Sequence, residues 1–115
     1  RPLVTHETIQ KCIAKLRKCD AVVPVISVVE SLRKKDSRNG TVAVDRTEYL
    51  IVQTPQCFKR DVLEKAYALS YHSKITDDAG LVEEAGFSIS TVEGNSENVK
   101  ITTQADLKYA ELFLR

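Results

Sequence analysis

Residues 40–58 constrain the fold most, because two short apolar runs in this stretch each end abruptly on polar residues. The first run, residues 41–44, is typical of a strand and leads directly into Asp45 and Arg46. The second run, residues 49–52, ends in the sequence Gln-Thr-Pro-Gln. Ligands of α/β sheets bind beyond the ends of strands, so both polar endings are candidate binding segments.

Hydrophobic spacing predicts a helix over residues 6–18. Thr5 is suited to cap it, and its apolar stripe follows the i, i+3, i+4, i+7 pattern with Ile9, Cys12, Ile13 and Leu16. The nearly unbroken valine-rich run at residues 21–29 then predicts a strand covered on both faces. Pro24 cannot donate a ladder hydrogen bond, so it marks an edge, a bulge or an early end of this strand.

Residues 30–46 predict a projecting β-hairpin arm. Residues 30–38 are strongly polar, and they are followed by Asn39-Gly40 and the strand at residues 41–44. Asn-Gly tolerates the positive φ angles of a type I′ turn, which joins two twisted strands tightly. The arm is too charged to be buried in the core of a monomer.

The second half of the chain predicts helices and short strands in alternation. A helix is expected over residues 59–70, followed by a short helix capped by Thr76 and ended by Gly86 as its C′ residue. A strand at residues 87–92 and a short extended piece around Lys100 come next. Thr103 and Asp106 resemble a capping box that opens a last helix, with Leu107, Ala110 and Leu114 on one face. This order predicts a layered α/β sheet.

Composition excludes several classes of protein. The net charge is +1 with acids and bases interspersed, so no global field recruits nucleic acid or a membrane. The three cysteines include no Cys-x-x-Cys, which favours reduced, buried thiols over a disulfide or a metal site. No apolar run reaches the ~20 residues of a membrane span. The sequence also has no Gly-x-Ser-x-Gly, no His/Cys metal spacing and no phosphate-cradling glycine loop.

Four polar side chains are candidates for chemistry, and each has two interpretations. Arg46 either forms a surface ion pair with Asp45 or directs its guanidinium fork at a phosphate. Lys100 alternates with two apolar neighbours, so it faces either solvent or a cleft. Thr54 ends a strand and offers a hydroxyl. Thr76 either only caps its helix or also presents an anion-binding helix start.

Six motifs along the chain fall in the order and spacing of one family. They are Arg1-Pro2-Leu3-Val4-Thr5, Val44-Asp45-Arg46, Gln53-Thr54-Pro55-Gln56-Cys57-Phe58, Ile75-Thr76-Asp77-Asp78-Ala79, Val92-Glu93-Gly94 and Asn98-Val99-Lys100-Ile101-Thr102-Thr103. The sequence resembles the C-terminal half of the 2-C-methyl-D-erythritol 4-phosphate cytidylyltransferases of the non-mevalonate isoprenoid pathway. The resemblance extends over essentially all 115 residues.

The resemblance implies a Rossmann-like nucleotidyltransferase fold, with residues 1–115 forming the C-terminal part of a single domain. It implies an enzyme that transfers CMP from CTP to methylerythritol phosphate and releases pyrophosphate. Arg46 and Lys100 match the cationic catalytic positions of the family, and its substrate-binding positions correspond to Arg1, Ser31, Thr54 and Thr76. Ser31 stands where the family usually has threonine.

The resemblance also implies Mg²⁺, with ligands outside this sequence, and a homodimer in which the arm hooks around a second subunit. The expected location is the bacterial cytoplasm, or a plastid if the source is a plant. The chain begins on Arg-Pro without Met, which indicates part of a longer protein, and the family's CTP-gripping glycine-rich loop is not in it.

Two alternatives stay open. Ribitol-5-phosphate cytidylyltransferases share the same motifs, although Thr-Asp-Asp-Ala favours methylerythritol phosphate. The second alternative is a non-catalytic module that only dimerises through its arm.

Overall fold

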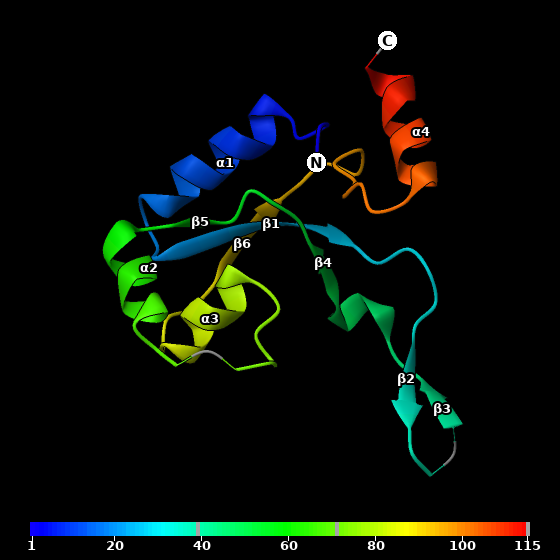
Figure 1. The fold of residues 1–115 in the computed structure, drawn as a ribbon, viewed down its shortest axis with the longest axis horizontal. Helices are drawn as coiled ribbons and strands as arrows, with labels where there is room; N and C mark the ends of the chain where they lie inside the picture. Colours follow the sequence, from blue (N-terminus) through cyan, green and yellow to red (C-terminus); the bar gives the residue numbers. More distant parts are fainter. Residues whose placement is uncertain (39, 71, 115) are drawn as a thin grey trace.

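The computed structural model describes residues 1–38, 40–70 and 72–114, which form a mixed α/β structure around one strand (Figure 1). That strand is β1 (Ala21–Ser27). Along one edge it pairs antiparallel with β4 (Leu50–Val52) and then β5 (Cys57–Phe58). Along the other edge it pairs in parallel with β6 (Ser90–Glu93). The predicted α/β class is therefore confirmed.

Helices cover both sides of the central strand, which is why its first four residues are buried. In Figure 1, α1 (His6–Leu16) and α3 (Asp78–Glu84) lie on opposite sides of β1. α2 (Arg60–Tyr67) packs against α3. The buried cluster on the α2 and α3 side consists of Ala21, Val62, Ala66, Leu81 and Val82. This arrangement matches the strand covered on both faces that the valine-rich run predicts.

Pro24 lies where the ladder of β1 is interrupted. Val25 pairs with Val52 and Val22 pairs with Cys57, so two residues of β1 face the four residues 53–56 of the returning chain. Pro24 still accepts a hydrogen bond from the backbone N–H of Gln53 (2.8 Å) through its carbonyl. β1 continues to Ser27, so Pro24 does not end the strand early. The extra residues lie in the returning chain, which separates β4 from β5 at residues 53–56.

The first helix confirms most of its prediction. Thr5 caps α1 by accepting a hydrogen bond from the backbone N–H of Thr8 (3.1 Å), and Cys12 is fully buried. The helix ends at Leu16 rather than at residue 18. Ile13 is 52% exposed, so its assignment to the buried stripe was wrong. Thr8 of this helix is also buried, and its hydroxyl donates a hydrogen bond to the Asn95 side-chain oxygen (2.9 Å).

The three cysteines are free thiols, but only Cys12 is buried; Cys19 and Cys57 are partly exposed, so the prediction of buried thiols is correct for Cys12 alone. Cys12 lies beside Cys57 of β5, and burial raises the pKa of Cys12 to about 11, with the neighbouring thiol adding to the effect. Cys12 is therefore protonated and buried at neutral pH.

The arm forms the predicted hairpin and extends away from the main sheet (Figure 1). β2 (Arg33–Asp36) pairs antiparallel with β3 (Gly40–Ala43), one residue earlier than the predicted strand. Gly40 has a φ of 80°, a left-handed conformation that favours glycine. Asn39 of the predicted type I′ turn lies outside the described residues.

The second half of the chain corrects four expectations. α3 is capped by Asp77, not Thr76, because the Asp77 carboxylate accepts a hydrogen bond from the N–H of Gly80 (2.8 Å). β6 begins at Ser90 rather than at residue 87, since the preceding residues pack against the core as irregular chain. α2 ends at Tyr67, short of residue 70. The segment around Lys100 forms no strand within the described chain.

The last helix starts as predicted and packs less than predicted. Thr103 and Asp106 form a reciprocal capping box at the start of α4 (Gln104–Phe113). Ala110 is buried, whereas Leu107 and Leu114 of the predicted apolar face are exposed.

Gly86, at φ 95°, ends α3 as predicted. Over the described ranges, no helix has both the length and the apolar character needed to cross a membrane.

Candidate substrate site

A hollow of about 430 Å³ lies where the chain leaves β4, next to the loop that follows β6. Four of the six predicted site residues line it: Arg1, Thr54, Thr76 and Lys100. They come from four separate segments of the chain. The fold therefore brings together side chains that the sequence could only mark individually.

Two cationic groups face this hollow. The Arg1 guanidinium donates a hydrogen bond to the backbone carbonyl of Asn98, and partial burial lowers the pKa of Arg1. A guanidinium nevertheless stays charged in proteins. Lys100 is exposed and forms no ion pair with any described residue. Two cations that line one hollow make it suited to a phosphate group.

The two threonines keep their hydroxyls available. Because Asp77 caps α3, the Thr76 hydroxyl is not used for capping, and it lines the hollow instead. Thr54 is held through its backbone carbonyl, which accepts a hydrogen bond from the Asn98 side-chain amide (2.9 Å). Both threonines are exposed. Their hydroxyls can therefore donate to an oxygen-rich ligand.

Gln56 is a further lining residue, and it holds the start of α3. Its amide N–H donates to the Asp77 carboxylate (2.9 Å), and its amide oxygen accepts from the backbone N–H of Ala79 (3.1 Å). Both oxygens of Asp77 are thus engaged, one by Gln56 and one by the N–H of Gly80. The Asp77 carboxylate serves the local structure while Thr76 beside it faces the hollow.

A second hollow of about 440 Å³ continues the first, since both are lined by Thr54, Gln56, Thr76 and Asp77. Its remaining lining includes apolar side chains, Ile75 and Leu81 among them. Together the two hollows form a groove with cations at one end and a partly apolar wall at the other. The groove therefore offers positive charge, hydroxyl groups and apolar surface to one ligand.

The other two predicted residues lie elsewhere. Ser31 and Arg46 line a separate hollow of about 420 Å³ at the base of the arm. Arg46 donates to the backbone carbonyl of Val29 (2.7 Å), and Asp45 accepts from the backbone N–H of Thr47 (2.9 Å). The surface ion pair between Asp45 and Arg46 is therefore not formed. The phosphate-binding role of Arg46 stays a prediction.

The family model for 2-C-methyl-D-erythritol 4-phosphate cytidylyltransferase matches residues 1–115. The chain belongs to this family. The cytidylyltransferase of Bacteroides fragilis is 45% identical over 114 residues, which cover 99% of this chain and 52% of that protein. The cytidylyltransferase of Caldanaerobacter subterraneus is 40% identical over 118 residues, covering 100% of this chain and 52% of that protein. The chain spans about half the length of the curated relatives it matches.

The fold agrees with solved cytidylyltransferases. The crystal structure of the Thermus thermophilus enzyme superposes with a TM-score of 0.85 at 31% identity, covering 98% of this chain and 57% of that one. The Francisella tularensis cytidylyltransferase gives a TM-score of 0.84 at 29% identity, covering 97% and 54%. The nucleotidyltransferase fold implied by the motifs is thereby confirmed.

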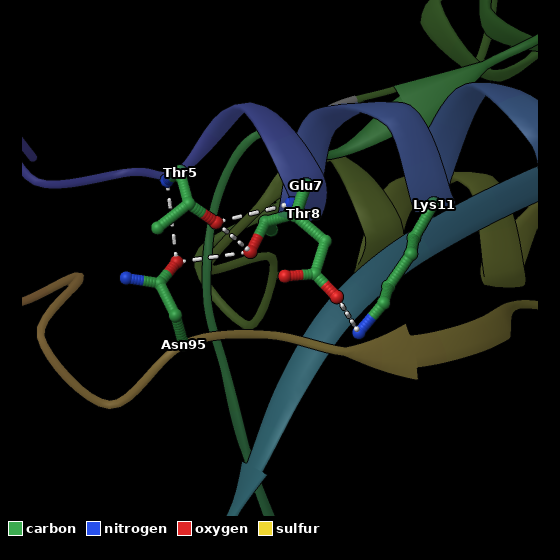
Figure 2. A network of polar contacts seen from close by, with 5 residues as sticks. All are labelled: Thr5, Glu7, Thr8, Lys11 and Asn95. Carbon is green, nitrogen blue, oxygen red and sulfur yellow. Dashed lines mark hydrogen bonds and ion pairs between the residues drawn. The ribbon is translucent and has the colours of Figure 1, made fainter.

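The sequence did not reveal the buried side chains of Gln53 and Asn98 or the partly buried side chain of Asn95. Figure 2 shows Asn95 beside the start of α1, where it accepts hydrogen bonds from the Thr8 hydroxyl (2.9 Å) and the Thr5 backbone N–H (3.4 Å). Asn95 also donates to the carbonyl of Leu3 (3.0 Å), which anchors the segment that carries Arg1. Gln53 and Asn98 lie inside the family motifs, which was the signal available for them, whereas Asn95 lies between two motifs.

The described residues contain no cluster of metal-ligating side chains. No group of three or more His, Cys, Asp and Glu side chains gathers in residues 1–38, 40–70 and 72–114. The expectation from the family resemblance, that Mg²⁺ ligands lie outside this sequence, stays a prediction.

Proposed function

We propose that the full-length protein transfers CMP from CTP to 2-C-methyl-D-erythritol 4-phosphate. The observation that carries this proposal is the gathering of Arg1, Thr54, Thr76 and Lys100 around one hollow, in a chain of the cytidylyltransferase family. The names of the relatives support methylerythritol phosphate over ribitol phosphate.

The residue types suit this chemistry. An oxygen of the substrate phosphate attacks the α-phosphorus of CTP, a new P–O bond forms, and the bond to the β-phosphate breaks to release pyrophosphate. The attacking oxygen is already anionic, so no general base is needed. Catalysis then depends on positioning two polyanions and on offsetting negative charge. Lys100 and Arg1 supply positive charge, and the hydroxyls of Thr54 and Thr76 supply donors.

The test measures pyrophosphate release by the full-length protein with CTP, Mg²⁺ and one polyol phosphate at a time. We expect turnover with methylerythritol phosphate and at most slow turnover with ribitol 5-phosphate. Faster release with ribitol 5-phosphate would favour the alternative substrate. No release with either polyol would leave the non-catalytic dimerisation module as the better account.

We also propose that the protein is a homodimer in which the arm serves the neighbouring site. Two observations support this arrangement. Ser31 and Arg46 line a hollow different from the one that contains Lys100. The arm extends away from its own sheet (Figure 1). A twofold dimer would then hold two composite sites, each with Lys100 from one chain and Arg46 from the other.

Subunit mixing tests the dimer. Arg46→Ala and Lys100→Ala are made in separate full-length chains, which are then unfolded and refolded together in equal amounts. Random pairing gives about half mixed dimers, each with one intact composite site, so roughly a quarter of wild-type activity should return. If both residues served the same chain, every site would carry a lesion and mixing would restore nothing. Native mass spectrometry verifies that mixed dimers formed.

The role of Mg²⁺ and a cytoplasmic location stay predictions that rest on the family resemblance alone.

A further inference from the structure

We propose that Gln53 and Asn98 form a reciprocal amide clamp that positions the substrate residues Thr54 and Lys100 relative to each other. Gln53 lies at the edge of the hollow with its side-chain amide engaged by backbone carbonyls, and Asn98 is fully buried, so both act as positioning residues. The inference rests on the proposed function, because it assigns the clamp to the groove in which the polyol phosphate binds.

Each clamp residue reaches across to the backbone of the other segment. The Gln53 side-chain amide donates to the carbonyls of Asn95 (2.9 Å) and Asn98 (3.5 Å). In return, the Asn98 side-chain amide donates to the carbonyl of Thr54 (2.9 Å). Gln53 is 2% exposed and Asn98 is fully buried, so water cannot readily replace these bonds.

The clamp joins segments that carry three site residues. Thr54 directly follows Gln53, and Lys100 lies two residues after Asn98. The carbonyl of Asn98 also accepts the hydrogen bond from Arg1. A shift of the loop that contains Asn98 would therefore move both cations of the groove relative to the Thr54 hydroxyl.

The orientation of both amides is fixed by their partners. Each side-chain nitrogen faces carbonyl oxygens, and an amide oxygen could not take its place because two acceptors would then meet. The side-chain oxygens of Gln53 and Asn98 are left buried without a partner among the described residues. The described contacts use both side-chain nitrogens to hold backbone carbonyls of the opposite segment.

Gly94 provides the space that the clamp requires. A Cβ atom at this position would lie 2.2 Å from the side-chain oxygen of Gln53, far inside van der Waals contact. Gly94 does not have a left-handed φ, so the close approach of Gln53 is what requires glycine here. Gly94→Ala should therefore displace the Gln53 side chain and open the clamp.

The experiment compares four variants of the full-length protein: Gln53→Ala, Gly94→Ala, the double variant Gln53→Ala/Gly94→Ala, and Val62→Ala as control. Misplacement of reacting groups by about 1 Å can lower reaction rates by about 100-fold. The kcat/KM for methylerythritol phosphate should therefore fall roughly 10- to 100-fold in both Gln53→Ala and Gly94→Ala. The KM for CTP should not change. Val62 lies in the core cluster beneath α2, so Val62→Ala should lower thermal stability and leave both kinetic constants unchanged.

The double variant separates a steric role of Gly94 from a backbone role. Alanine at position 53 removes the oxygen with which the new Cβ would clash, so the double variant should be no slower than Gln53→Ala alone. A double variant that is far slower than Gln53→Ala would overturn the assignment of Gly94.

Two further outcomes decide the proposal. The clamp would be overturned if Gln53→Ala had an unchanged kcat/KM. It would also be overturned if Val62→Ala, at the same thermal stability, lost as much kcat/KM as Gln53→Ala. If the wild-type protein transfers no CMP, the proposed function fails, and the clamp is then tested by calorimetric titration with inorganic phosphate. The clamp predicts that Gln53→Ala weakens phosphate binding as Lys100→Ala does, while Val62→Ala does not; equal binding in wild type and Gln53→Ala would refute it.

Discussion

Replacement of Thr8 by valine tests whether one buried hydrogen bond anchors α1 more strongly than a nearby ion pair. The Thr8 hydroxyl donates to the side-chain oxygen of Asn95 (2.9 Å), and Thr8 is only 2% exposed (Figure 2). Valine has nearly the same shape and cannot donate. The Asn95 oxygen would keep only the longer bond from the Thr5 backbone N–H (3.4 Å).

The magnitude follows from burial. A hydrogen bond contributes about 1 kcal/mol net to stability, and a buried acceptor left poorly satisfied costs about 1–3 kcal/mol. The methyl group that valine adds offsets part of this loss, so Thr8→Val should lower the free energy of unfolding by about 1–2 kcal/mol. The control is Lys11→Gln, which breaks the ion pair between Lys11 and Glu7 (3.2 Å) one turn along. The Glu7 side chain is 77% exposed, so this pair should contribute no more than about 0.5 kcal/mol.

Both variants are compared with wild type by urea unfolding of the full-length protein, followed by circular dichroism. If the m-values of the variants are similar, a change in the urea concentration at the midpoint reports a change in the free energy of unfolding. A Thr8→Val variant as stable as wild type, together with a clearly destabilised Lys11→Gln variant, would refute the view that the Asn95 contact anchors α1.

Three other predictions follow from the same structure. Lys100→Ala should lower kcat by roughly 10²–10³-fold with little change in stability, because it removes a positive charge that is exposed and unpaired among the described residues. Near-normal turnover in steady-state assays would show that Lys100 is an ordinary surface residue. Hydrogen bonds from the side chains and backbones of Thr103 and Thr102 lower the pKa of Asp106 to about 2, below the ordinary value of about 3.9. The ionised Asp106 therefore stabilises the fold above pH 4, and this contribution is lost as the pH falls toward 2. Asp106→Asn should reduce the loss of stability at acid pH in a pH series of unfolding measurements, and an unchanged loss would contradict the capping box. Burial and the raised pKa of Cys12 predict that iodoacetamide at pH 8 modifies Cys19 of the native protein before Cys12, and peptide mass spectrometry that finds Cys12 alkylated first would reverse the assignment.

Local patterns in the sequence predicted the elements that local interactions determine. The Thr5 cap, the Thr103–Asp106 capping box and the hairpin arm each depend on residues a few positions apart, and all three are found. The buried position of Cys12 followed from helical spacing in the same way.

Long-range contacts explain the failures. Gln53 and Asn98 are buried because each bonds to a segment more than 40 residues away in sequence, and residue type alone predicts exposure for both. Thr76 was expected to cap α3, but its neighbour Asp77 accepts the capping bond while Gln56 holds its other oxygen. The separation of Arg46 from Lys100 into two hollows likewise depends on where the arm leaves the sheet.

Isotope tracing of the transferred oxygen tests the central claim most directly. The full-length protein is incubated with CTP, Mg²⁺ and methylerythritol phosphate that carries oxygen-18 in its phosphate, and the products are analysed by phosphorus NMR. If the substrate phosphate is the nucleophile held by Arg1, Thr54, Thr76 and Lys100, the label appears in the new diphosphate bridge of a CDP-linked product, and the pyrophosphate is unlabelled. Labelled pyrophosphate, or CTP that remains intact while the protein is folded, would contradict the account.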